Sequence, residues 1–242
     1  MSSSTFTSSL YLLSFTLLIQ IVIGVNPLFH FCSSLEKFTA NSPYESNLNK
    51  LMRYLYHKTP PTGFSVGSVG QYGNKANGLS LCRGDVNSED CAACVAEASG
   101  GIRKRCPYNK GSVIWYDNCL VKYSNTNFFG KIDNGNKFYL WNFRNVSNPL
   151  SFNQKTKNLL SRLSQQAYVA PKMYATGELK LGYSKKLYGL VQCTRDLSSV
   201  DCKKCLDGII SELPSCCNGK EGGRVVGGSC NFRYEIYPFV NA

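Results

Sequence analysis

The pattern of apolar and polar positions in the first half of the chain predicts two helices and four strands. Apolar residues fall three and four apart over 47–57, which is the spacing of one helix face. Residues 64–71 and 79–82 alternate apolar with small or polar positions around a Gly- and Asn-rich turn, as a hairpin does. Capping side chains then open a helix over 87–103, and the run 112–123 supplies two further strands.

The second half repeats these elements in the same order. Helical spacing covers 152–166, and 174–193 predicts a hairpin. Ser198 caps a second helix, and two strands over 224–226 and 230–237 follow it. Because helices and strands do not alternate regularly, each half is predicted to be an α+β domain with two helices on one face of an antiparallel sheet.

Five cysteines confirm that the chain contains two copies of one module. Cys193 follows Cys82 by 111 residues, and four further pairs have the same separation. Five matched positions without a slip indicate an internal repeat. The first set is Cys82, Cys91, Cys94, Cys106 and Cys119, and the second is Cys193, Cys202, Cys205, Cys217 and Cys230.

The N-terminus indicates export. Residues 1–25 are apolar after a Ser- and Thr-rich start, as in a secretory signal peptide, although no Lys or Arg precedes the apolar run. The alternative is an uncleaved membrane anchor, but Ser14, Thr16 and Gln20 interrupt the run and leave it short for a span. We expect a soluble, extracellular mature protein without a transmembrane segment.

In an oxidising compartment the twelve cysteines are expected to form disulfides. The alternatives are a zinc site or a redox pair, because Cys91 and Cys94, like Cys202 and Cys205, have the C-x2-C spacing. Zinc would need a second close pair, and neither C-x2-C pair has a neighbouring His. We therefore expect no metal and no cofactor.

The formal net charge of +12 is spread along the chain. It favours polyanions such as acidic cell-wall polysaccharide, whereas nucleic acid is not an expected partner for an exported chain; a solvated surface without any charged partner is the alternative. Residues 126–148 form a polar inter-domain segment, yet they contain enough aromatic residues to supply a strand and pack the domains together. Asn145 lies in this segment in the one glycosylation sequon.

The chain contains the spacing C-x8-C-x2-C twice, and its second copy includes LYGLVQCTRDLSSVDCKKCL and CNFRYEIYPF. In these features it resembles the plant cysteine-rich repeat secretory proteins, which consist of tandem ginkbilobin-type domains of the stress-antifungal family. The resemblance covers the mature chain and places the domains at 26–125 and 149–242. It implies two helices on a five-stranded antiparallel sheet in each domain, and a role in defence in the plant apoplast.

The resemblance also implies a disulfide pattern. In the second module nothing near 141–144 matches Cys32, so Cys217 lacks its expected partner, and Cys216 has no counterpart in the first module. Two pairings are then compatible with the sequence: a vicinal bond between Cys216 and Cys217, or an intermolecular disulfide. The implied pairs are Cys32 with Cys106, Cys82 with Cys91, Cys94 with Cys119, Cys193 with Cys202, and Cys205 with Cys230.

Single-domain members of the family bind mannose through an Asn, an Arg and a Glu, and the matching positions in the second module are Asn142, Arg224 and Glu235. A donor fork and a carboxylate on rigid strands suit paired sugar hydroxyls. The alternative is a cross-strand ion pair between Arg224 and Glu235 that sets register. The first module has Ser33, Val113 and Ser124 at these positions, so it is not expected to bind sugar in this way.

No catalytic motif accompanies His30 and His57, and enzyme activity is not expected. We predict a secreted, monomeric or homodimeric, non-enzymatic binding protein with a defence role, whose second module binds mannose-type glycan. Two alternatives stay open. One is a protein-interaction module that serves as a soluble partner of related receptor ectodomains, and the other is a thiol oxidoreductase using Cys216 or Cys217.

Overall fold

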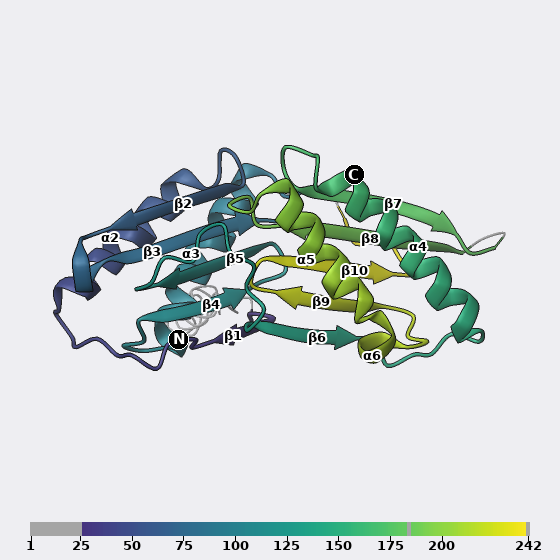
Figure 1. Ribbon diagram of the computed structural model, residues 1–242, viewed down its shortest axis with the longest axis horizontal. Coiled ribbons are helices and arrows are strands. Elements are labelled where there is room, and N and C mark those ends of the chain that lie inside the picture. Colours follow the sequence, from purple (N-terminus) through teal and green to yellow (C-terminus); the bar gives the residue numbers. More distant parts are fainter. Residues whose placement is uncertain (1–25, 183–184, 241–242) are drawn as a thin grey trace, which may run out of the picture.

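The computed structural model describes residues 26–182 and 185–240, and the predicted signal peptide 1–25 lies outside the described residues. Two five-stranded antiparallel sheets lie side by side (Figure 1). In this view the helices of the first half lie behind their sheet, and those of the second half lie in front of theirs. The predicted α+β class, with helices on one face of each sheet, is confirmed.

The first sheet has the strand order β1-β4-β5-β3-β2. Its helices begin where the sequence supplies caps: the side chain of Ser42 accepts a hydrogen bond from Glu45 N, and that of Asn87 accepts one from Asp90 N. The elements are β1 (Phe29–Phe31), α2 (Pro43–Lys58), β2 (Phe64–Val69), the 3-10 turn η1 (Tyr72–Asn74), β3 (Ala76–Cys82), α3 (Ser88–Arg105), β4 (Gly111–Trp115) and β5 (Cys119–Ser124).

The second sheet repeats this order as β6-β9-β10-β8-β7. Ser198 caps α5 as predicted, by accepting a hydrogen bond from Asp201 N. None of the helices in the described residues is long and apolar enough to cross a membrane. The elements are β6 (Lys137–Trp141), α4 (Pro149–Ala167), β7 (Tyr174–Lys180), β8 (Lys186–Cys193), α5 (Ser199–Ser211), α6 (Leu213–Cys217), β9 (Gly223–Gly227) and β10 (Cys230–Glu235).

Several boundaries differ from the sequence-based prediction. Helix α2 begins four residues before 47, because Pro43 fits the first helical turn and Ser42 caps it. The short elements β1 and α6 were not predicted, since three and five residues carry too little periodicity to detect. Strand β10 ends at Glu235 rather than at 237.

Disulfides tie helices to strands in each half. The five bonds implied by the family resemblance are present, and Cys216 bonds to Cys217. Cys91 and Cys94 lie on the face of α3 that looks at the sheet, and they bond to β3 and β5. No free cysteine occurs among the described residues.

Aromatic packing and hydrogen bonds join the two domains. The ring of Phe138, on β6, stacks on Phe29 at 5.2 Å and meets Trp115 edge-on at 5.2 Å. Trp115 Nε1 donates to the carbonyl of Gly227, and Gln192 Nε2 donates to that of Cys82. The segment 126–148 therefore supplies both the edge strand of the second sheet and part of the junction.

Candidate functional site

Strand register shows which residues of the two modules are equivalent. Phe29 pairs with Trp115, and Phe138 pairs with Val226, which lies 111 residues after Trp115. Phe29 and Phe138 are therefore equivalent, and counting onward makes Trp141 equivalent to Cys32 and Asn142 to Ser33. The edge strand of the second sheet thus has no cysteine at the matching position, and the sulfur of Cys217 bonds to Cys216 instead.

The three predicted sugar-binding residues line one hollow. Asn142 follows β6, Arg224 lies on β9, and Glu235 ends β10; all three border a cavity of about 450 Å³. Exposed aromatic side chains lie along the same border: Phe143 is 94% exposed and Trp141 is 51% exposed. The structure therefore brings Asn142 together with two residues that lie more than eighty positions later in the sequence.

Arg224 is held by the first domain. Its Nη1 lies 2.6 Å from Oδ1 of Asp117, in the turn between β4 and β5, and its side chain is only 11% exposed. Burial lowers the pKa of Arg224, and the negative charge of Asp117 opposes that shift. The structure pairs Arg224 with Asp117 and Glu235 with Arg233 at 3.1 Å, rather than forming the cross-strand Arg224–Glu235 ion pair considered as the alternative.

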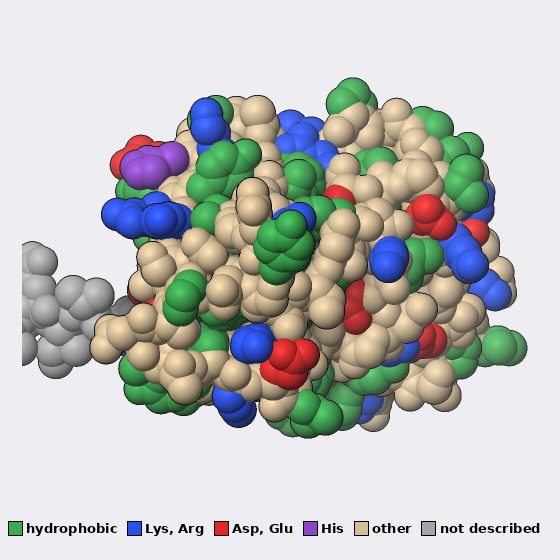
Figure 2. Space-filling view, turned by 60° about the vertical axis from the view of Figure 1, so that its left-hand side comes forward, with side chains coloured by type: hydrophobic (Ala, Val, Ile, Leu, Met, Phe, Trp, Pro, Cys, Tyr) green, Lys and Arg blue, Asp and Glu red, His purple; other side chains and the backbone are tan. Residues whose placement is uncertain are grey.

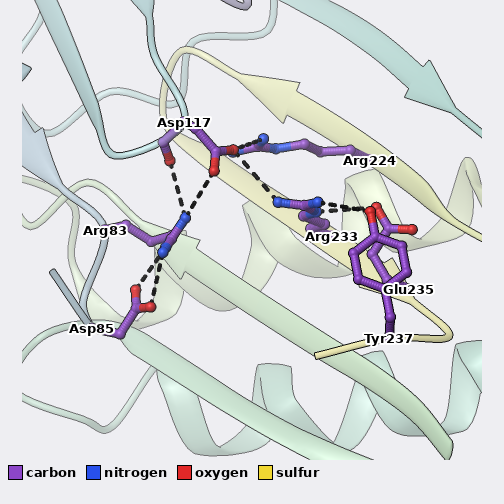
Figure 3. A network of polar contacts seen from close by, with 7 residues as sticks. All are labelled: Arg83, Asp85, Asp117, Arg224, Arg233, Glu235 and Tyr237. Carbon is purple, nitrogen blue, oxygen red and sulfur yellow. Dashed lines mark hydrogen bonds and ion pairs between the residues drawn. The ribbon is translucent and has the colours of Figure 1, made fainter. Parts of the chain in front are cut away.

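Arg224 and Arg233 occupy directly opposed positions on β9 and β10, where two like charges repel. The carboxylate of Asp117 relieves this repulsion, since Oδ1 also lies 3.5 Å from Arg233 Nη1. Its other oxygen lies 3.1 Å from Nη1 of Arg83, which in turn binds Asp85 at 2.6 Å. Figure 3 shows the Asp117 carboxylate pointing toward all three guanidinium groups.

The pKa of Asp117 reflects these neighbours. Burial alone would raise the pKa of this carboxyl, but the charge and the hydrogen bond of Arg224, with smaller contributions from Arg233 and Arg83, bring it below its ordinary value. Asp117 is thus a carboxylate over the physiological pH range. Its position lets the first domain fix the orientation of Arg224.

Glu235 packs against the backbone of the hollow. Its Oε1 accepts from Arg233 Nε, and a Cβ added to Gly222 would lie 1.9 Å from its Oε2. Burial raises the pKa of Glu235, while Arg233 and Tyr237 oppose the shift. The Glu235 carboxylate can therefore occupy this position only because residue 222 has no side chain.

Asn142 is positioned by the backbone beside it. Its N–H donates to the carbonyl of Gly222, and its Oδ1 accepts from the N–H of Arg144. The loop after α6 also pairs with this segment, since Asn145 forms a bridge with Lys220. Asn145, the sequon residue, is exposed.

The first module offers no similar charged set. Val113, equivalent to Arg224, is fully buried in an apolar cluster with Trp115. Sequence reasoning missed the contribution of Asp117, Arg83 and Arg233. Only Arg233, two residues before Glu235 and on the same face of its strand, could have been found from the sequence, because the other two meet Arg224 through the domain junction.

Comparison with known proteins agrees with this architecture. Residues 31–126 and 141–237 each match the family described as salt stress response/antifungal. The chain is 60% identical to the antimicrobial ginkbilobin-2-like protein of Castanea crenata over the full length of both. It is also 61% identical over 216 residues to the cysteine-rich repeat secretory protein 38 of Arabidopsis thaliana, covering 88% of this chain and 85% of that protein.

A solved structure shares the arrangement of both domains. The tandem DUF26 ectodomain of the Arabidopsis thaliana cysteine-rich receptor-like protein PDLP8 superimposes with a TM-score of 0.78 at 26% identity, covering 88% of this chain and all of that one. The secretory relatives and the two family matches identify an extracellular protein. The chain belongs to the salt stress response/antifungal family, as two tandem copies of its cysteine-rich domain.

Proposed function

We propose that this protein is a non-enzymatic defence protein that binds mannose-type glycan through its second domain. The observation that carries the proposal is the convergence of Asn142, Arg224 and Glu235 on one hollow bordered by exposed aromatic rings. A guanidinium and a carboxylate held on neighbouring strands match the paired hydroxyls of a sugar, and aromatic rings suit its apolar face. The antimicrobial name of the Castanea crenata relative supports the defence role.

Binding of mannan and of a glycan array, measured at moderate salt, tests this proposal. The variant Glu235→Gln removes the charge of the acceptor and keeps its shape, and we expect at least about a tenfold loss of affinity. Glu178→Gln is the matched control, because Glu178 likewise forms an ion pair with a single cation, Lys186 at 2.7 Å, but lies outside the hollow. Equal losses in the two variants, or no selective binding by the unaltered protein, would refute the sugar site.

A second candidate function is protein interaction, with related receptor ectodomains as partners. It is favoured by the exposed apolar side chains of Leu140, Trp141 and Phe143 along and just after β6, which is an edge strand of its sheet. Phe143→Ser should abolish capture by an immobilised ectodomain of that class if this function operates. Unchanged capture would show that these apolar side chains do not form the binding surface for the ectodomain.

We also propose that Asn145 carries an N-linked glycan, because the sequon lies on an exposed segment of an extracellular protein. The secreted protein should lose the mass of one glycan on enzymatic deglycosylation, and Asn145→Gln should show no such change. A single mass before and after treatment of the unaltered protein would contradict the assignment.

A further inference from the structure

A second hollow lies between the domains, and its lining, among the described residues, includes three cations and no carboxylate. It has a volume of about 290 Å³, at the lower end of the range of small-molecule sites. The first domain contributes the approach to β2 and the turn after β3, and the second contributes the end of β8. Its charged lining residues are Arg83, Lys172 and Arg195.

Arg195 is the central cation of this cleft. Its Nη2 donates to the carbonyl of Thr62 at 2.6 Å, and its guanidinium lies 5.0 Å from the centre of the Phe64 ring. Burial lowers its pKa, and among the described residues no carboxylate opposes that shift. A partly buried guanidinium without a counter-charge is costly, so an anion that enters the cleft gains a full electrostatic partner.

Lys172 adds a second positive charge, for which the described residues supply no ion-pair partner. Its Nζ donates to the carbonyl of Gly84 at 3.0 Å, which leaves two further N–H groups on the ammonium. Arg83, by contrast, is already neutralised by Asp85 and Asp117. Lys172 and Arg195, both from the second domain, therefore supply the free positive charge.

The balance of charge distinguishes this cleft from two other hollows among the described residues. The candidate mannose site has Arg224 and Arg233 opposed by Asp117 and Glu235. A hollow beside α5 has three cations and three acids: Lys131, Lys137, Lys204, Asp133, Asp201 and Glu212. On the face drawn in Figure 2, Lys and Arg are likewise dispersed among acidic and apolar side chains.

The neutral lining groups indicate a polar ligand. Gln192 is 3% exposed, and its Nε2 donates to the carbonyl of Cys82, so its Oε1 is available to accept from a hydroxyl. Ser88, which carries a hydroxyl, lines the same cleft. We propose that this cleft binds an acidic oligosaccharide, with the carboxylate of a uronic acid held by Arg195 and Lys172 and its hydroxyls by Gln192 and Ser88.

Calorimetry with a linear trimer of galacturonic acid, in about 0.15 M salt, tests the proposal. The fully methyl-esterified trimer keeps every hydroxyl and lacks the charge, so it should bind at least about tenfold more weakly. Arg195→Gln with Lys172→Gln should lose at least about tenfold in affinity for the acid trimer, and mannan binding should stay unchanged.

The matched control is Arg162→Gln with Lys157→Gln on α4. It also removes one arginine charge and one lysine charge, and Arg162, like Arg195, donates to a backbone carbonyl, that of Glu178. The control should change affinity by less than about twofold. Equal loss in the control, equal binding of the ester, or equally tight binding of inorganic sulfate would overturn the proposal. If the double variant fails to fold, Lys172→Gln alone carries the test, since it removes one exposed contact.

Discussion

The carboxylate of Asp117 should be a stability determinant of the domain junction. Asp117→Asn keeps the shape of the side chain and removes its charge, which leaves Arg224 and Arg233 opposed across β9 and β10 without a counter-ion. Arg83 also loses one of its two acidic partners. Each such hydrogen bond contributes about 1.5–3 kcal/mol when buried, but exposed pairs contribute about 0–1 kcal/mol.

Asp117 is 47% exposed, whereas its three partners are 9–17% exposed, so each contact should lie below the buried range. We therefore expect a loss of about 2 kcal/mol in the free energy of unfolding at pH 7. For a chain of this size that corresponds to a fall of about 4–8 °C in Tm. Glu178→Gln is the control, since its carboxylate is 49% exposed and has a single lysine partner, and it should cost less than about 0.5 kcal/mol.

The pH dependence gives a separate check. The pKa of Asp117 is lower in the folded protein than in the unfolded chain, so its contribution is fully present above about pH 4 and is lost as pH falls through the folded pKa. The difference between the unaltered protein and Asp117→Asn in urea denaturation should shrink over that acid range. A difference below about 0.5 kcal/mol at pH 7, or one that is independent of pH, would refute the account of the network.

Three further predictions follow from the same contacts. Gly222→Ala should reduce mannan binding at least about tenfold, because the new Cβ displaces Glu235. The control Gly208→Ala, whose Cβ would meet nothing within 4 Å, should bind mannan normally and gain up to about 1 kcal/mol in stability. Equal binding by both variants would contradict the role of Gly222. Since burial raises the pKa of Glu235, mannan binding should weaken as pH falls, with a midpoint above 4.5, and a midpoint below that value would exclude the carboxylate as the titrating group. Replacing Cys32 and Cys106 by Ala should lower the free energy of unfolding, measured by urea denaturation, by about 4 kcal/mol, because their bond closes a long loop of sequence separation 74. Replacing Cys216 and Cys217 should lower it by about 1 kcal/mol, because these residues are adjacent. Similar losses in the two variants would argue against a chain-entropy origin of the stabilisation.

The helix boundaries show which features local sequence signals can predict. Asn87 and Ser198 were recognised as caps because Asn and Ser accept hydrogen bonds from the first turn in any fold. The constant separation of 111 residues predicted two similar domains, since equal cysteine spacing requires equal helix and strand placement. Short elements such as β1 and α6 were not predicted, because β1 is fixed by pairing with β4 and α6 by the burial of Leu213 and Cys217, rather than by a periodic pattern of their own.

The sequence by itself determined the α+β class and the repeat, because both depend on spacing along the chain. The three residues of the candidate mannose site were proposed from the resemblance to the family, which assigns a role to those positions. Only the tertiary structure decided that Arg224 pairs with Asp117 rather than with Glu235, and that Arg195 and Lys172 share a cleft without an acid. The physical reason is that both arrangements form where the two domains meet, and the distances across that junction depend on how the two folded sheets pack rather than on any local sequence signal.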